Sequence, residues 1–246
     1  MKKLLLLFGL LLSGMIAYCQ HYNNAYGKPL VVLTITDPWL MVIGSDVPSF
    51  AVYENGSVIC KKIEDRRARY YEGKIDKEKQ QHILEALKIT DTLKRLPDRI
   101  KASNWTDQPD NELIINIDSV KMIDVYGNLK GSDARAKTPK AYLAAYDAIM
   151  DFKIDNAKEW MPDSVEVMLT GYSYAPEKSA TWPANWPGLK DPNTVIRGDD
   201  LYSIYLDKKY FADFIKLTSS LKEKQAVEID GKKFSLSYRL PFPNVR

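Results

Sequence analysis

Short stretches of alternating hydrophobic and polar residues recur along the chain, and this period of two predicts β-strands. Three of these stretches contain a turn pair, so we expect three antiparallel hairpins, centred on residues 55–56, 118–119 and 230–231. A type I′ turn is expected at Asn55-Gly56, because both residues tolerate positive φ. Further strands are predicted over residues 29–36, 69–75, 164–172 and 201–206.

Three longer stretches carry apolar residues at helical spacing. Each begins at a residue that caps helices well, namely Asp76, Thr138 or Asp207. The predicted amphipathic helices span residues 77–88, 139–150 and 208–221. Hairpins combined with separate helices are typical of the α+β class. We therefore predict an α+β fold, with antiparallel sheets from hairpins and three amphipathic helices packed against them.

A weak internal repeat is visible in the pattern. The stretch from Tyr71 to Lys77 matches the stretch from Tyr202 to Lys208, and a helix and a hairpin are predicted after each. This similarity predicts two related halves; the alternative is that unrelated strand–helix–hairpin units share capping and alternating residues. Residues 152–162 are interpreted as a linker. The predicted division is a signal peptide at 1–19, an N-terminal α+β half at 20–155 and a C-terminal α+β half at 156–246.

The first residues have the composition of a secretory signal peptide. Lys2 and Lys3 precede an apolar run from Leu4 to Leu12. That run is shorter than the roughly 20 residues that a membrane-spanning helix needs, and no later stretch is long and apolar enough to span a bilayer. We therefore predict an exported protein, periplasmic or extracellular, without a transmembrane helix.

Cleavage is expected before Gln20, because Ala17 and Cys19 are the small residues of an A-x-A-like site. The alternative is lipidation of Cys19, which would anchor the protein to a membrane. Tyr18 stands where a bacterial lipobox has a small residue, so simple cleavage is favoured. The leucine-rich signal and Gln20 resemble exported proteins of the Bacteroidota, and residues 48–59 resemble a hairpin of uncharacterised exported bacterial proteins. The resemblance implies export and no particular activity.

Composition argues against several partners and cofactors. The formal charge is +3, and basic and acidic residues are interleaved. The sequence therefore lacks the basic stripe that is typical of nucleic-acid-binding proteins. Once Cys19 is removed, Cys60 is the only thiol, and an internal disulfide cannot form. His21 and His82 are too few and too far apart in sequence to predict a zinc site. No phosphate-binding glycine loop is found, and we expect no cofactor.

No catalytic residue can be assigned from a motif. Ser219 and Lys222 fit S-x-x-K, but the companion motifs of the penicillin-recognising enzymes are missing. Asp107, Asp110 and Glu112 are close in sequence, and we interpret them as residues of a solvated loop. A carboxylate pair for hydrolysis stays open as a hypothesis, because such pairs form in space and not in sequence.

The most distinctive segment is a long loop rich in proline and aromatic residues. Tyr172 and Tyr174 lie at its start, and Trp182 and Trp186 each precede a proline. Prolines stiffen the backbone, and outward-facing aromatic side chains would form a surface for a glycan or protein partner of the envelope. The alternative is that both indoles pack onto the sheet and close the core.

Three functional hypotheses remain. The leading one is a non-enzymatic binding or interaction protein of the periplasm or cell surface, such as an immunity protein that blocks a toxin. It is supported by the lack of catalytic motifs and the near-neutral charge. The second is an exported hydrolase that acts on envelope or environmental polymers through a carboxylate pair. The third is a structural envelope component, which would expose a broad apolar patch.

Overall fold

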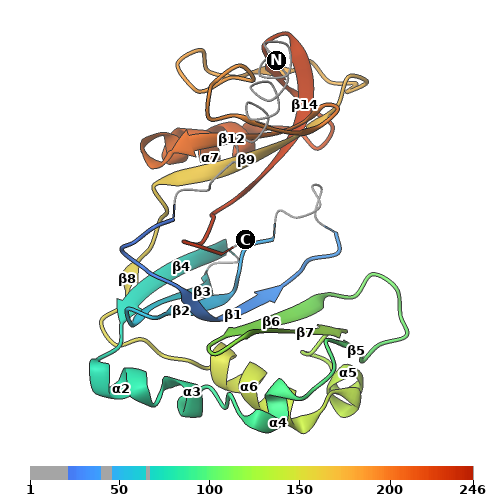
Figure 1. Cartoon of the computed structure of the whole chain (residues 1–246). Helices are drawn as coiled ribbons and strands as arrows, with labels where there is room; N and C mark the ends of the chain where they lie inside the picture. Colours follow the sequence, from blue (N-terminus) through green and yellow to red (C-terminus); the bar gives the residue numbers. More distant parts are fainter. Residues whose placement is uncertain (1–21, 40–45, 65–66, 246) are drawn as a thin grey trace, which may run out of the picture.

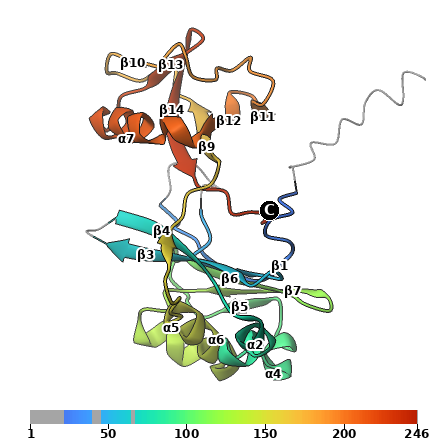
Figure 2. The ribbon, with the colours of Figure 1, turned by 90° about the vertical axis from the view of Figure 1, so that its left-hand side faces the viewer.

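The computed structural model describes residues 22–39, 46–64 and 67–245. The predicted signal peptide, including Cys19, lies outside these ranges. Within them the strands form two β-sheets, and helices pack on one face of each (Figure 1, Figure 2). The protein therefore has an α+β fold, as the sequence predicts. No helix of the described ranges is long and apolar enough to cross a membrane.

The first sheet has eight strands. They are β1 (Pro29–Ile35), β2 (Phe50–Tyr53), β3 (Ser57–Glu64), β4 (Arg67–Lys74), β5 (Arg99–Lys101), β6 (Asp110–Asn116), β7 (Val120–Tyr126) and β8 (Lys158–Glu159). Their order is β5-β7-β6-β1-β2-β3-β4-β8. Strand β8 belongs to the range predicted as the C-terminal half, 156–246, yet it pairs with β4 of the first sheet.

The second sheet has six strands. They are β9 (Ser164–Gly171), β10 (Ala180–Thr181), β11 (Val195–Gly198), β12 (Leu201–Asp207), β13 (Val227–Ile229) and β14 (Lys232–Arg239). Their order is β10-β13-β14-β9-β12-β11. The pairs β5–β7 and β10–β13 are parallel, so both sheets are mixed rather than purely antiparallel as predicted. Both β5 and β10 are short edge strands that no hairpin joins to their partner.

The helices differ from the predicted set of three. They are α2 (Lys77–Gln81), α3 (Ile83–Ala86), α4 (Asp91–Lys94), α5 (Ser132–Lys137), α6 (Lys140–Met150), the 3₁₀ turn η1 (Lys208–Tyr210) and α7 (Phe211–Ser220). The segment predicted as one helix over 77–88 is divided at His82, whose φ of −104° and ψ of 3° interrupt the α-helix. Helix α6 lies within the predicted range 139–150, and η1 continues into α7 within 208–221.

The hairpin turns follow local sequence, with one correction. Asp230 and Gly231 both have positive φ, 50° and 78°, which is the type I′ combination. Between β2 and β3, Gly56 has a φ of 84°, and its N–H donates to the carbonyl of Tyr53 at 2.9 Å. Asn55 is not among the positive-φ residues, so the predicted type I′ turn is wrong there. This loop is instead a type I turn followed by a left-handed glycine.

Alternation along the strands of the first sheet divides it into two faces. On β1, Val31 and Leu33 pack against the helices, whereas Val32 faces the opposite way. On β2, Phe50 joins the helix side and Ala51 the other side. Side chains alternate between the two faces of a strand, so these central strands carry apolar residues on both faces. A sheet with two apolar faces must be covered on both sides. The first sheet is therefore sandwiched at β1–β4.

The second covering layer is a junction with the C-terminal part of the chain, defined by Trp160, Leu240 and Phe242. Their side chains pack on Tyr53 and Tyr70 of the first sheet. The ring of Phe242 lies 5.0 Å from that of Trp160 and 5.7 Å from that of Tyr70, both edge-on. Figure 1 shows the segment after β14 descending to the first sheet. The junction thus joins the two sheets.

The two related halves are not confirmed by the topology. In the first sheet the opening strand of the hairpin, β6, pairs with β1. In the second sheet the closing strand of the hairpin, β14, pairs with β9. The two hairpins therefore join their sheets through different strands, the first strand in one case and the second strand in the other. The sequence pattern shared by the stretches from Tyr71 and from Tyr202 does not extend to this pairing.

Phe242→Ala should lower the free energy of unfolding by about 3 kcal/mol, because the truncation leaves a cavity among packed rings. The side chain is only 3% exposed. Urea denaturation monitored by circular dichroism checks the change. Ile63→Ala is the control, because Ile63 is 67% exposed and should change stability by less than about 0.5 kcal/mol. Equal effects of the two substitutions would contradict the junction as a stabilising contact.

Candidate functional site

The aromatic loop, residues 172–194, runs from the end of β9 to the start of β11 and contains all four predicted binding residues. Trp182 and Trp186 are buried, at 6% and 8% exposed, whereas Tyr174 is 80% exposed. Tyr172 is partly buried, and its ring meets that of Tyr174 edge-on at 4.9 Å. The indoles therefore do not face outward. They close the core of the second sheet, which is the alternative that the sequence left open.

Both indoles hold the loop from the inside. Their rings meet edge-on at 4.9 Å, and each lies within 6.4 Å of the ring of Phe214 on α7. The Trp182 Nε1–H donates a hydrogen bond to the carbonyl of Pro187 at 2.9 Å. A buried indole needs an acceptor for this N–H, and Trp182 finds it within its own loop. This hydrogen bond spans residues 182–187 and thus fixes the short segment that contains both tryptophans.

The loop is also attached to the turn between β13 and β14. The N–H of Leu189 donates to Oδ2 of Asp230 at 2.8 Å. Thr194 Oγ1 donates to the carbonyl of Gly188 at 2.8 Å. A Cβ at Gly188 would lie 2.9 Å from Oδ2 of Asp230, so a side chain there would displace the carboxylate that accepts the Leu189 N–H. These contacts fix the outer part of the loop.

A hollow of about 1100 Å³ lies between this loop, the β13–β14 turn and the start of η1. Aromatic side chains contribute to its wall: Trp182, Trp186, Tyr205 and Tyr210. Its charged lining residues are Lys178, Lys190, Lys209, Lys233, Asp191, Asp207, Glu228 and Asp230, so opposite charges are equal in number. Asn185 and Asn193 also line the hollow and are exposed. The result is an open site with aromatic, amide and balanced charged groups.

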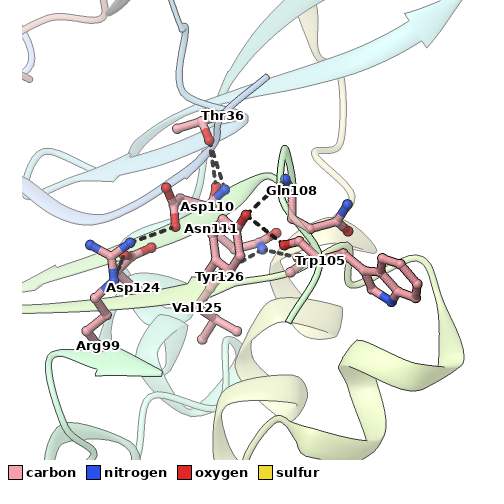
Figure 3. Close-up of polar contacts among 10 residues, drawn as sticks. Thr36, Arg99, Trp105, Gln108, Asp110, Asn111, Asp124, Val125 and Tyr126 are labelled. Carbon is pink, nitrogen blue, oxygen red and sulfur yellow. Dashed lines mark hydrogen bonds and ion pairs between the residues drawn. The ribbon is translucent and has the colours of Figure 1, made fainter. Parts of the chain in front are cut away.

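A second polar group lies on the first sheet, on the face opposite the helices (Figure 3). Alternation along β6 and β7 places Asp110, Glu112 and Asp124 on this face. The strand register pairs Glu112 with Asp124, and Arg99 of β5 is the partner of Asp124 on the other side. The guanidinium of Arg99 lies 3.7 Å from one carboxylate oxygen of Asp110 and one of Asp124.

Neighbouring hydrogen bonds hold this end of β6 and β7. The N–H of Asp110 donates to Thr36 Oγ1 on the segment after β1, at 2.9 Å. The Tyr126 hydroxyl donates to the carbonyl of Trp105 at 2.9 Å and accepts the N–H of Gln108 at 3.3 Å. Figure 3 shows the indole of Trp105 pointing away from the two aspartates. The loop before β6 is thus tied to β7 beside the carboxylates.

The pKa of Asp124 is raised from its ordinary 3.8 to about 6, and burial is the largest cause. The negative charge of Asp110 and a hydrogen bond with Asp110 contribute to this rise in pKa, and the positive charge of Arg99 opposes it. Burial and the charge of Asp110 also raise the pKa of Glu112. Oδ1 of Asp110 and Oδ1 of Asp124 are both buried and accept no hydrogen bond, although the guanidinium of Arg99 lies 3.7 Å from Oδ1 of Asp110. Sharing one proton between the two carboxyls relieves this arrangement.

The proximity of the aspartates limits their chemistry. The guanidinium of Arg99 lies 3.7 Å from both Asp110 and Asp124, whereas the acids of glycoside hydrolases flank a bound sugar and are roughly 5 Å or more apart. The pair therefore suits a shared proton better than that two-carboxylate mechanism. Across the residues that the structure describes, no three acidic, histidine or cysteine side chains are placed to hold a metal ion.

The interpretation of Asp110 and Glu112 as residues of a solvated loop is wrong, because both belong to β6 and are partly buried. Asp107 does lie in the exposed loop before that strand. Nothing in the local sequence marks Asp124 or Arg99. The hairpin register would have placed Glu112 opposite Asp124, but the parallel pairing that brings in Arg99 has no local signal.

Asp124→Asn should stabilise the protein at pH 7–8 and have little effect near pH 4. The pKa of Asp124 is raised in the folded state, so its contribution to stability is present below its ordinary 3.8 and is lost as pH rises through about 6. The neutral amide avoids that loss, which we expect to be on the order of 1–2 kcal/mol at pH 8. Urea denaturation at pH values from 4 to 8 measures it.

Asp118→Asn, an exposed carboxylate on the same hairpin, is the matched control and should follow the wild-type pH profile. A stability difference between Asp124→Asn and the wild type that stays constant from pH 4 to 8 would contradict the proton-sharing pair.

Comparison with known proteins found no matching family model, no matching curated protein and no matching solved structure. Function must therefore be argued from the chemistry of the site itself.

Proposed function

We propose that this chain is an exported, non-enzymatic binding protein that recognises a partner or ligand in the periplasm or at the cell surface. The observation that carries the proposal is the hollow of about 1100 Å³ beside the aromatic loop. Binding sites are usually concave and largely preformed, with aromatic walls and a few polar groups. The hollow has these properties, and Trp182 and Trp186 serve as its scaffold.

Preorganisation of the loop favours binding. Pro183 and Pro187 restrict the backbone, and the bonds of Trp182 to Pro187 and of Leu189 to Asp230 fix both parts of the loop. A surface that is ordered before binding loses less conformational entropy when the ligand arrives. Tyr174, at 80% exposed, lies at the start of the same loop and is the predicted site residue best placed to contact a partner directly.

A hydrolase is the second candidate. The raised pKa of Asp124 favours it, because general acids are often carboxyls that stay protonated near neutral pH. The contact between Asp124 and Asp110 counts against separate acid and base roles. For a structural envelope component, a broad apolar patch would be expected; the exposed side chains of Trp39, Ile63 and Ile196 lie instead on the segment after β1, on β3 and on β11. We therefore place binding first.

A photo-crosslinking amino acid at Asn185 should form covalent adducts in the cells that naturally produce the protein. Asn185 is exposed and lines the hollow. The same group at Glu159, which is exposed on the first sheet, is the control. Mass spectrometry of the recovered protein should detect a discrete light-dependent mass increase at position 185 alone. Identical products from both positions would contradict a binding site in the hollow.

Export also stays a proposal that rests on the first residues of the sequence. Intact-mass measurement of the protein recovered from its source cells should give a mature chain that begins at Gln20, because Ala17 and Cys19 form the predicted cleavage site. A chain that begins at Cys19 and carries the additional mass of a diacylglycerol would instead indicate lipidation and a membrane anchor. A mature chain that still begins at Met1 would contradict signal cleavage.

A further inference from the structure

We propose that the hollow beside the aromatic loop takes a neutral, hydroxyl-rich ligand, an oligosaccharide. This inference rests on the proposed binding function and names the ligand class of the same site. Three features carry it: the charge balance of the lining, the combination of ring faces with side-chain amides, and a loop backbone that is poorly suited to bind a peptide.

The charge balance argues against a strongly charged ligand. Four lysines and four carboxylates line the hollow, so it offers no excess of either sign to attract a polyanion or a polycation. Several of the carboxylates are already used within the protein. Asp191 accepts the N–H of Asn193 at 3.0 Å, Asp207 accepts that of Lys209 at 2.9 Å, and Asp230 accepts that of Leu189.

Aromatic and amide groups in the hollow match the surfaces of a sugar. Tyr210 is partly exposed; its ring lies 6.0 Å from that of the buried Trp186 at a tilt of 42°, and Lys209 Nζ lies over the ring, 4.8 Å from its centroid. An aromatic ring offers apolar contact area at low entropic cost. Asn185 and Asn193 are exposed in the same hollow, and each amide both donates and accepts hydrogen bonds, as sugar hydroxyls do.

The backbone of the loop disfavours the main peptide-binding mode, in which an extended peptide adds a strand to a sheet edge. The edge strand that borders the hollow is β10, which has two residues and offers too short a template. Pro183 and Pro187 follow it and have no N–H to donate. Recognition by side chains is therefore favoured over recognition by backbone, which suits a sugar.

Titration of the mature chain, followed by ¹⁵N NMR, tests this inference. The probes are maltohexaose, cellohexaose, xylohexaose and the hexamer of N-acetylglucosamine, with hexagalacturonate as an acidic sugar and tetra-alanine as a peptide. At least one neutral sugar should shift the side-chain amides of Asn185 and Asn193 and the indole N–H of Trp186 in a saturable way. Tetra-alanine and hexagalacturonate should leave these resonances unchanged.

The double substitution Asn185→Ala with Asn193→Ala should weaken that binding about tenfold or more, the effect of losing amide hydrogen bonds to the ligand. Both side chains are exposed, and the N–H of Asn193 that bonds Asp191 is kept, so the fold should be unaffected. Asn104→Ala, an exposed asparagine on the loop before β6, is the matched control and should bind like the wild type.

The outcomes separate the two proposals. Saturable shifts from tetra-alanine or hexagalacturonate, without shifts from a neutral sugar, would overturn the ligand class and leave the binding function standing. If no neutral sugar binds at 10 mM while crosslinking at position 185 still yields an adduct, the ligand class alone fails. If neither experiment gives a signal, both proposals fail.

Discussion

The contact on which the rest of this structure depends is the junction between the C-terminal segment and the first sheet. Phe242 and Trp160 cover Tyr70 on the face that the helices leave free, and they join strands that lie far apart in the sequence. Without them, apolar residues such as Val32 and Ala51 would lie on a solvent-exposed sheet face, at a cost of about 25 cal/mol for each Å² of apolar surface. Burial of apolar side chains at this junction therefore holds the two sheets against each other.

A buried network of charged side chains lies in the second sheet, at the end of β14 that leads into the junction. Glu166 on β9 is fully buried, and its carboxylate accepts hydrogen bonds from Ser203, Arg197 and Arg239 at 2.6 to 2.9 Å. Burial alone would raise the pKa of Glu166, but the two arginines and the Ser203 hydroxyl together hold it below its ordinary value. Removing one partner would leave a buried charge uncompensated. The network thus fixes the end of β14 just before the chain crosses to the first sheet.

The two candidate sites use polar groups in different ways. At the hollow, hydrogen bonds of the backbone and of the Trp182 indole hold the loop, and the amides of Asn185 and Asn193 are exposed. At the aspartate pair, the strand register brings like charges close together, Arg99 compensates for them, and the pKa of Asp124 is raised. The first arrangement favours recognition, because it is preformed and neutral overall. The second makes stability depend on pH and does not separate an acid from a base.

The sequence by itself determined the α+β class, the hairpins at residues 118–119 and 230–231 and the segment that contains α6, because turn preference and apolar spacing act between near neighbours. The export signal stays a prediction. Only the tertiary structure decided that Trp182 and Trp186 are buried, that Asp124 meets Asp110, and that β5 and β10 pair in parallel. Each of these depends on which distant segments become neighbours, and the burial of apolar surface across the whole chain makes that choice.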